Sequence, residues 1–93
     1  MKIKVYNIFR NIGSDNGGII LACKRITKEK LVQGCVLIVN ESISIPIFHF
    51  EENERYNDIN LFIDEFNRYS EDLSYNNIVQ KEFFILNSDN SNL

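Results

Sequence analysis

The chain has 93 residues, of which 44% are hydrophobic and 25% are charged, and its formal net charge is −3. This length fits one domain with its own core, and it leaves too few residues to enclose a large internal ligand. No apolar stretch is long enough for a membrane span or a signal peptide, and with only two cysteines this pattern predicts a soluble cytoplasmic protein.

Four strands are predicted in the first half of the chain. Ile3 and Val5 alternate with Lys2 and Lys4, which is the period of a half-buried strand. Further strands are expected at 19–26, 31–39 and 43–50, separated by turns and charged loops. Because proline has no backbone N–H to donate, Pro46 places the fourth strand at a sheet edge or gives it a bulge.

The apolar spacing changes to that of a helix over 53–73. A last strand is expected at 78–86, in the middle of the sheet or paired with the first strand, and a flexible polar tail at 87–93. The predicted fold class is therefore α+β, with a single domain over 1–86. It has a twisted antiparallel sheet of about five strands and one amphipathic helix packed on one face, in the order β-β-β-β-α-β.

His49 is the only histidine, and Ser42 and Ser44 are nearby hydroxyls. No spacing selects these residues for nucleophilic or acid–base catalysis, which needs partners that the fold brings together. Strand alternation places His49 on the same face as Ile45 and Ile47, which favours a structural or merely solvated histidine. The chain is therefore predicted not to be an enzyme, with a small hydrolase using His49 as an alternative.

Cys23 and Cys35 would lie nearly opposite each other if 19–39 folds as a hairpin. Packing of the two thiols is favoured over a disulfide, and both remain open. Two cysteines and one distant histidine do not make a zinc site. The glycine-rich run at 13–18 lacks the lysine and hydroxyl of a phosphate-binding loop. No metal ion and no cofactor are expected.

One face of the predicted helix is acidic, and it is the candidate surface for a partner. At 100° per residue, Leu61 lies opposite the apolar face, which predicts an exposed apolar anchor among charged side chains. The predicted partner-binding residues are Asp58, Leu61, Asp64, Glu65, Arg68, Glu71 and Asp72, with Glu51, Glu52 and Glu54 as outlying support. The alternative is an ordinary solvated helix face with one exposed leucine.

Charge is divided unevenly along the chain. Residues 1–50 contain seven Lys or Arg against three Asp or Glu, whereas residues 51–93 contain three against ten. Such asymmetry says more about partners than the total charge does. We therefore expect a small acidic inhibitor of the toxin-immunity, antitoxin or phage anti-defence type. It would neutralise a protein with a basic surface, such as a toxin nuclease.

Other partners are weighed against this hypothesis. An accessory subunit would form a homodimer by pairing strands at a sheet edge. Nucleic acid is unlikely because the acidic half repels phosphate, and no membrane contact is expected. The basic and aromatic residues that would serve a nucleic acid are Lys2, Lys4, Arg10, Lys24, Arg25, Lys28 and Lys30, with Tyr6 and Phe9.

Overall fold

The computed structural model describes residues 1–10, 18–64 and 71–87. In these residues seven strands form one antiparallel sheet, accompanied by a single helix of four residues. The strands are β1 (Lys2–Arg10), β2 (Ile19–Arg25), β3 (Val36–Asn40), β4 (Ile43–Pro46), β5 (His49–Asn53), β6 (Asp58–Ile63) and β7 (Glu82–Leu86), and the helix is α1 (Tyr75–Ile78). The strand order across the sheet is β4-β3-β7-β1-β2-β6-β5.

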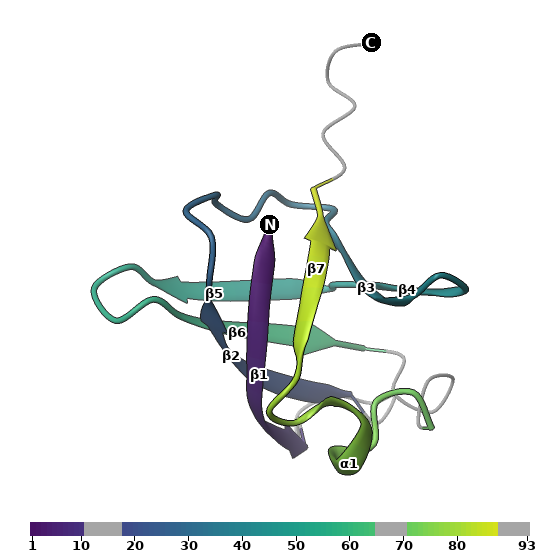
Figure 1. Cartoon of the computed structure of the whole chain (residues 1–93). Helices are drawn as coiled ribbons and strands as arrows, with labels where there is room; N and C mark the ends of the chain where they lie inside the picture. The colour runs from purple at the N-terminus through teal and green to yellow at the C-terminus, as the bar shows by residue number, and fades with distance from the viewer. Residues whose placement is uncertain (11–17, 65–70, 88–93) are drawn as a thin grey trace, which may run out of the picture.

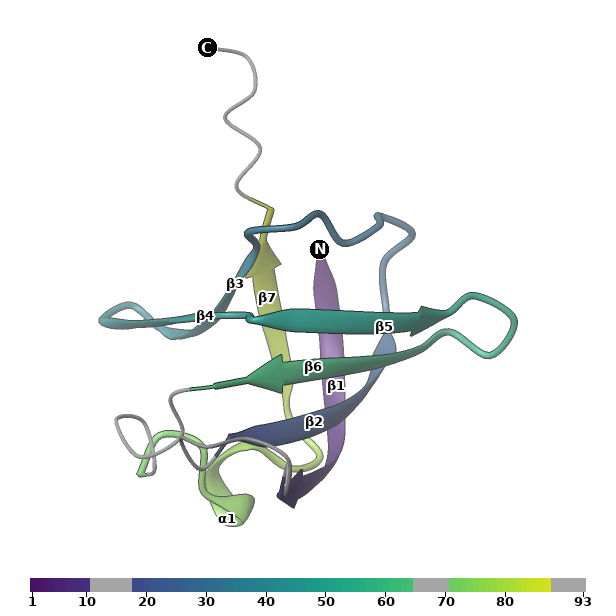
Figure 2. The same ribbon diagram turned by 180° about the vertical axis from the view of Figure 1, so that it is seen from behind.

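The sheet curls until its two edge strands meet, and these strands are consecutive in the chain. In Figures 1 and 2, β1 and β7 cross β5 and β6 at a steep angle. Only Ile47 and Phe48 join β4 to β5. The N–H of Ile47 donates to the carbonyl of Cys35 at 3.1 Å, and the N–H of Phe48 donates to the carbonyl of Phe62 at 2.9 Å. One bent segment therefore links both ends of the sheet and closes it into a small barrel.

The interior of this barrel is apolar. On each strand alternate side chains point inward, as the pleat of a strand requires. No buried polar or charged residue occurs within the described ranges. The largest side chains without measurable exposure are Ile3, Leu21, Leu37, Ile45, Leu61, Leu73 and Ile78. Burial of these side chains, at about 25 cal/mol per Å² of apolar surface, is the main force that holds the sheet in its curled form.

The predicted α+β fold with an amphipathic helix is wrong. The segment 53–73 contains the last residue of β5, a turn at 54–57 and the whole of β6. Within β6, Ile59, Leu61 and Ile63 are buried and the residues between them are exposed or half-buried, which is the period of two typical of a strand. The molecule is mostly β rather than α+β.

Local chemistry explains why this segment is a hairpin. Asn57 has a φ of 59°, the left-handed conformation that Asn tolerates better than most residues, and it lies in the turn before β6. The N–H of Tyr56 donates to the carbonyl of Asn53, which closes that turn. The helical spacing depended on grouping Phe62 with Ile63, but Phe62 lies on the outer face of the sheet.

Three other predicted elements differ from the structure. The strand expected at 31–39 begins only at Val36, because Gly34 turns the chain with a φ of 91°. The strand expected at 43–50 divides into β4 and β5, and Pro46 lies on an edge strand as expected. The strand expected at 78–86 begins at Glu82, after α1. It pairs with both β1 and β3, so both positions suggested for the last strand are confirmed.

The bend between β4 and β5 also changes which side chains face inward. Ile45 and Ile47 are buried, and after the bend Phe50 is packed against the core. Phe48 and His49 are therefore both exposed on the outside. His49 does not share a face with Ile45 and Ile47, because the alternation shifts by one residue at the bend.

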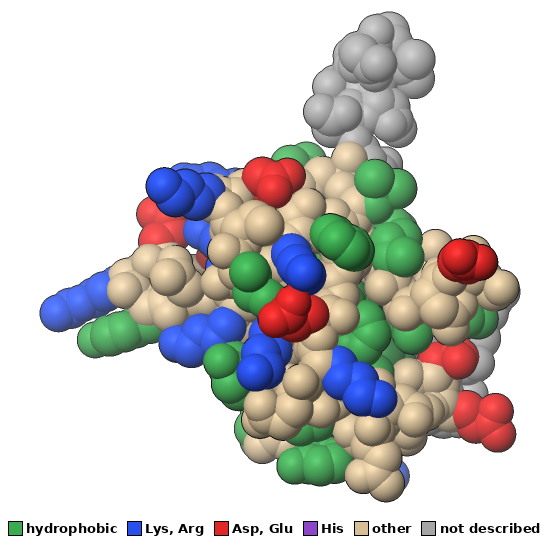
Figure 3. Space-filling model, viewed as in Figure 1, with side chains coloured by type: hydrophobic (Ala, Val, Ile, Leu, Met, Phe, Trp, Pro, Cys, Tyr) green, Lys and Arg blue, Asp and Glu red, His purple; other side chains and the backbone are tan. Residues whose placement is uncertain are grey.

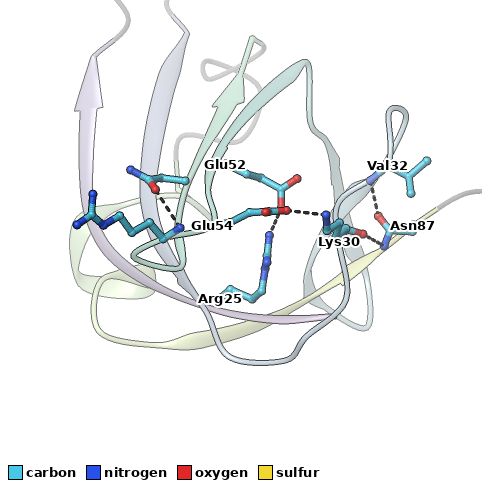
Figure 4. A network of polar contacts seen from close by, with 8 residues as sticks. Arg25, Lys30, Val32, Glu52, Glu54 and Asn87 are labelled. Atoms are coloured by element: carbon cyan, nitrogen blue, oxygen red, sulfur yellow. Dashed lines mark hydrogen bonds and ion pairs between the residues drawn. The ribbon is translucent and has the colours of Figure 1, made fainter.

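The loop between β2 and β3 arches over one end of the barrel (Figures 1 and 2). Figure 4 shows the polar contacts that fasten it. The Nζ of Lys30 lies 2.6 Å from a carboxylate oxygen of Glu54. The side chain of Asn87 donates to the carbonyl of Lys30 at 3.0 Å and accepts from the N–H of Val32 at 3.1 Å. Beneath them Arg25 pairs with Glu52 inside the barrel mouth.

Candidate functional site

The acidic residues predicted to bind a partner are mostly paired within the protein. Glu52 forms an ion pair with Arg25, whose side chain is only 9% exposed. Asp58 lies 2.7 Å from the Nζ of Lys24. The hydrogen bond and charge of Lys30 hold the pKa of Glu54 below its usual range. Three of the expected carboxylates therefore already have a cation of their own chain beside them.

Leu61 is not an exposed anchor. Its side chain is fully buried on the inner face of β6, because the segment is a strand and odd-numbered residues of β6 point into the barrel. Residues 58–63 form a strand instead of the predicted helix, so a helical interface that presents Leu61 is excluded. Glu65 and Arg68 lie outside the described residues.

The remaining predicted residues do not form one surface. Glu51 is exposed on β5, and one of its carboxylate oxygens lies 3.9 Å from the Nε2 of His49. Asp64 follows the end of β6. Glu71 and Asp72 lie in the turn before α1, where Asp72 lines a hollow of about 320 Å³ together with Lys81.

No catalytic arrangement is present in the residues that the structure describes. His49 packs against the Phe62 ring with the ring centroids 5.0 Å apart, and its side chain is 54% exposed. Cys23 and Cys35 are both buried free thiols. Cys23 lies on β2 and Cys35 directly precedes β3, and these strands are not neighbours in the sheet, so the predicted hairpin pairing is wrong. Burial raises the pKa of both thiols, to about 12 for Cys23, which makes them poor nucleophiles.

The same residues hold no cluster of three or more potential metal ligands. None of the described helical structure is long and apolar enough to cross a membrane. Catalytic and metal chemistry therefore supply no candidate site among the described residues, and the outer face of the sheet is the surface to consider.

An apolar strip covers the outer face of β4, β3 and β7. Phe84 and Leu86 of β7 are each 59% exposed, and both lie on the same face of that strand. In the sheet register, Val36 of β3 lies between Leu86 of β7 and Pro46 of β4. Phe84 of β7 lies opposite Ile38 of β3. We call these five residues the apolar strip.

A cationic margin borders the strip on β1. Lys2 is the register partner of Phe84, and its Nζ lies 5.5 Å from the Phe84 ring centroid. Lys4 follows on the same face, with its Nζ 5.7 Å from the Tyr6 ring centroid. Figure 3 shows Lys and Arg side chains gathered over β1 and its neighbours, with apolar side chains beside them.

A hollow of about 340 Å³ lies next to this margin. A β-bulge between Val5 and Asn7 adds Tyr6 to the outer face, because Asn7 and not Tyr6 is the register partner of Ala22. The small side chain of Ala22 leaves a depression in the outer face of the sheet at this point. The residues lining this Ala22 hollow are Tyr6, Ala22, Cys23, Lys24, Asp58 and Asn60.

Comparison of the chain with protein-family models, with curated proteins and with solved structures found no match. Inference about function therefore depends on the residues of this chain alone. Sequence reasoning missed both the apolar strip and the Ala22 hollow. The run 83–86 did contain a signal, since four consecutive apolar residues on a strand must expose two of them unless both faces are covered.

Proposed function

We propose that the protein is a non-enzymatic binding domain that takes a segment of another protein onto the apolar strip. The observation that carries this proposal is the exposure of Phe84 and Leu86 side by side with Val36, Ile38 and Pro46. Exposed apolar side chains that gather in one patch, rather than lying singly, mark interaction surfaces. Aromatic residues at the centre of such patches commonly provide most of the binding energy.

Charge supports an acidic partner segment. Lys2 and Lys4 border the strip, and Lys24 follows in the next strand. Lys2 pairs with Glu82 and Lys24 pairs with Asp58, so Lys4 is the lysine of this group that makes no ion pair with a described carboxylate. Among the described carboxylates that would attract a basic partner, Glu52, Glu54 and Asp58 are paired with cations of the same chain. A segment with apolar side chains flanked by Asp or Glu complements this surface.

Inhibition of a bacterial toxin or defence protein is one role that such a domain would serve, by occupying a functional surface of that protein. We keep this inhibitory role as a proposal, with the apolar strip in place of the acidic helix as the binding surface. Pairing of sheet edges between two copies receives less support. β4 has only four residues and ends in Pro46, and short strands with proline protect an edge from pairing.

The test compares two surface variants. Phe84→Thr and Leu86→Thr together remove the centre of the strip and keep side chains that favour strands. Phe48→Thr is the matched control, because Phe48 is 64% exposed and lies outside the strip. A partner captured from the native host is identified, purified and measured by calorimetry. The double variant is expected to bind about 30-fold more weakly, and the control is expected to bind as the unchanged protein does.

Three results would contradict the proposal. Equal binding by the double variant and the unchanged protein would place the interface elsewhere. A partner whose contact segment is basic would refute the charge argument. Sedimentation showing a dimer that the double variant abolishes would assign the strip to a second copy of the chain.

A further inference from the structure

The Ala22 hollow is a polar site formed by an irregularity in β1. The bulge leaves Tyr6 and Asn7 both facing outward against the single residue Ala22, so Tyr6 forms a wall above a low floor. The side-chain amide of Asn60 lines the hollow from β6. Bulges that re-aim a side chain in this way recur beside functional sites. A volume of about 340 Å³ suits one side chain or small group.

Two lysines lie at this site: Lys24 lines the hollow, and Lys4 lies beside it, with its Nζ 5.7 Å from the ring centroid of the lining residue Tyr6. Lys4 and Lys24 are direct register partners on β1 and β2. Like charges placed opposite each other in a sheet destabilise it, and an anion held between them would offset that repulsion. Lys24 is already paired with Asp58, but Lys4 makes no ion pair with any described carboxylate.

The other polar groups of the hollow also suit an anion. The amide nitrogen of Asn60 and the hydroxyl of Tyr6 are donors, and neither side chain makes a hydrogen bond to another described residue. Glu82, which pairs with Lys2, is the register partner of Lys4 on β7, and the carboxylate that lines the hollow itself is Asp58. It competes with an incoming anion for Lys24, so it weakens binding without preventing it.

We infer that the Ala22 hollow binds one anionic side-chain group of the partner segment, held by Lys4, Asn60 and Tyr6. The group is a carboxylate of Asp or Glu or a phosphate on a modified side chain, since both present oxygen acceptors with negative charge. This inference rests on the proposed function only for the source of the ligand, because the chemistry of the hollow stands apart from the apolar strip.

The test is a titration followed by backbone amide NMR shifts of the full chain. The probes are N-acetyl glutamate N-methylamide, N-acetyl phosphoserine N-methylamide and, as the neutral control, N-acetyl glutamine N-methylamide. The two anionic probes are expected to shift amides around Ala22 and Asn60, and the neutral probe is not. The stronger of the two identifies the source of the anion.

Three variants give effects of different sign. Lys4→Gln is expected to weaken binding of the anionic probes about tenfold, by loss of a charge-assisted contact. Asp58→Asn is expected to tighten binding about threefold, because it frees Lys24. Lys28→Gln, which removes an exposed charge in the loop after β2, is the matched control and should change nothing.

The inference is overturned if neither anion shifts the hollow, if the neutral probe shifts it equally, or if Asp58→Asn weakens binding. Phe84→Thr is expected to leave the titration unchanged. Failure of the hollow and failure of the apolar strip are therefore separate results.

Discussion

Cys23 shows how a small residue can be fixed by its surroundings. Its thiol is buried on the inner face of β2, next to Val5 on β1 and Ile59 on β6 in the register, and its Sγ lies 3.5 Å from the carbonyl oxygen of Leu21. Because the thiolate cannot be solvated there, burial raises the pKa of this thiol from 9.0 to about 12. The side chain therefore serves packing, and the fold depends on its staying neutral.

Stability at alkaline pH follows from this shift. The pKa of Cys23 is higher in the folded than in the unfolded chain, so its contribution to stability is complete below pH 9 and is lost as pH rises from 9 towards 12. In that window the free energy of unfolding should fall by about 1.4 kcal/mol per pH unit from this group. Urea unfolding of the unchanged protein and of Cys23→Ala between pH 8 and 11 measures the effect. Equal slopes for the two proteins would contradict it.

Arg25 and Glu52 show the opposite case, in which charged residues point inward. Arg25 follows Leu21 and Cys23 on the inner face of β2, and its Nε is buried with no hydrogen-bond partner among the described residues. Pairing with Glu52 offsets the cost of removing this cation from water. An inward-pointing charge on the edge strand β5 also discourages pairing with other chains.

At the scale of elements, β6 decides between the predicted and the observed fold. Leu61 has no exposed surface in the sheet, whereas it would be exposed on the helix that the spacing predicted. Leu61→Asp is therefore expected to unfold the protein, because an unpaired carboxylate in the core costs more than the whole stability of a small domain. Circular dichroism and thermal melting measure this outcome.

Asn60→Asp is the matched control for that change. Asn60 is the neighbouring residue of β6, but it is exposed on the outer face. The variant is expected to keep the fold, with a change of less than about 1 kcal/mol in the free energy of unfolding. A folded Leu61→Asp protein would show that β6 does not contribute its odd-numbered residues to the core.

Strands β1 and β2 were predictable because they have clear local signals, whereas the bounds predicted for 31–39 and 43–50 were wrong. Ile3 and Val5 alternate with lysines, and the run from Ile19 is apolar and bounded by turn residues. The segment 53–73 was not predictable by the same means, since Ile59, Phe62 and Ile63 fit the period of a helix and Ile59, Leu61 and Ile63 fit the period of a strand. Pairing with β2 and β5 makes this segment a strand rather than a helix, and such pairing cannot be read from the residues of the segment alone.

The candidate surfaces were less predictable than the strands. The Ala22 hollow depends on a bulge, which period-two alternation along β1 does not reveal. The apolar strip depends on the register between β3, β4 and β7, which brings Val36, Pro46 and Leu86 together from distant parts of the chain.

At the scale of the whole molecule, the uneven distribution of charge along the sequence leads to ion pairs between the two halves of the chain. Cations of the first half pair with carboxylates of the second, as in Lys2 with Glu82, Lys24 with Asp58 and Lys30 with Glu54. Exposed ion pairs contribute little to stability, so their number matters less than their distribution. The two halves match in charge because the sheet interleaves them, and the asymmetry therefore does not by itself indicate a charged partner.

The position of each strand in the sheet predicts an order of local opening. β2 is bonded on both sides, to β1 and β6, whereas β4 pairs on one side only, with β3. Hydrogen exchange under native conditions should therefore be at least about tenfold slower for the amides of β2 than for those of β4. NMR exchange at neutral pH measures both sets in one experiment. Equal rates would mean that the sheet opens only as a whole.

The bend at Ile47 and Phe48 has a consequence for how the length of such a chain can vary. Inward-facing positions are odd-numbered in β4 and even-numbered in β5, so inserting or deleting one residue here would turn His49 and Glu51 into the barrel and Phe50 out into water. A change of length in the turn at 54–57 or in the loop at 26–34 would not by itself reverse which side chains of the flanking strands face inward. Insertions and deletions are therefore expected to be tolerated in that turn and that loop, whereas the number of residues in the bend has to stay constant.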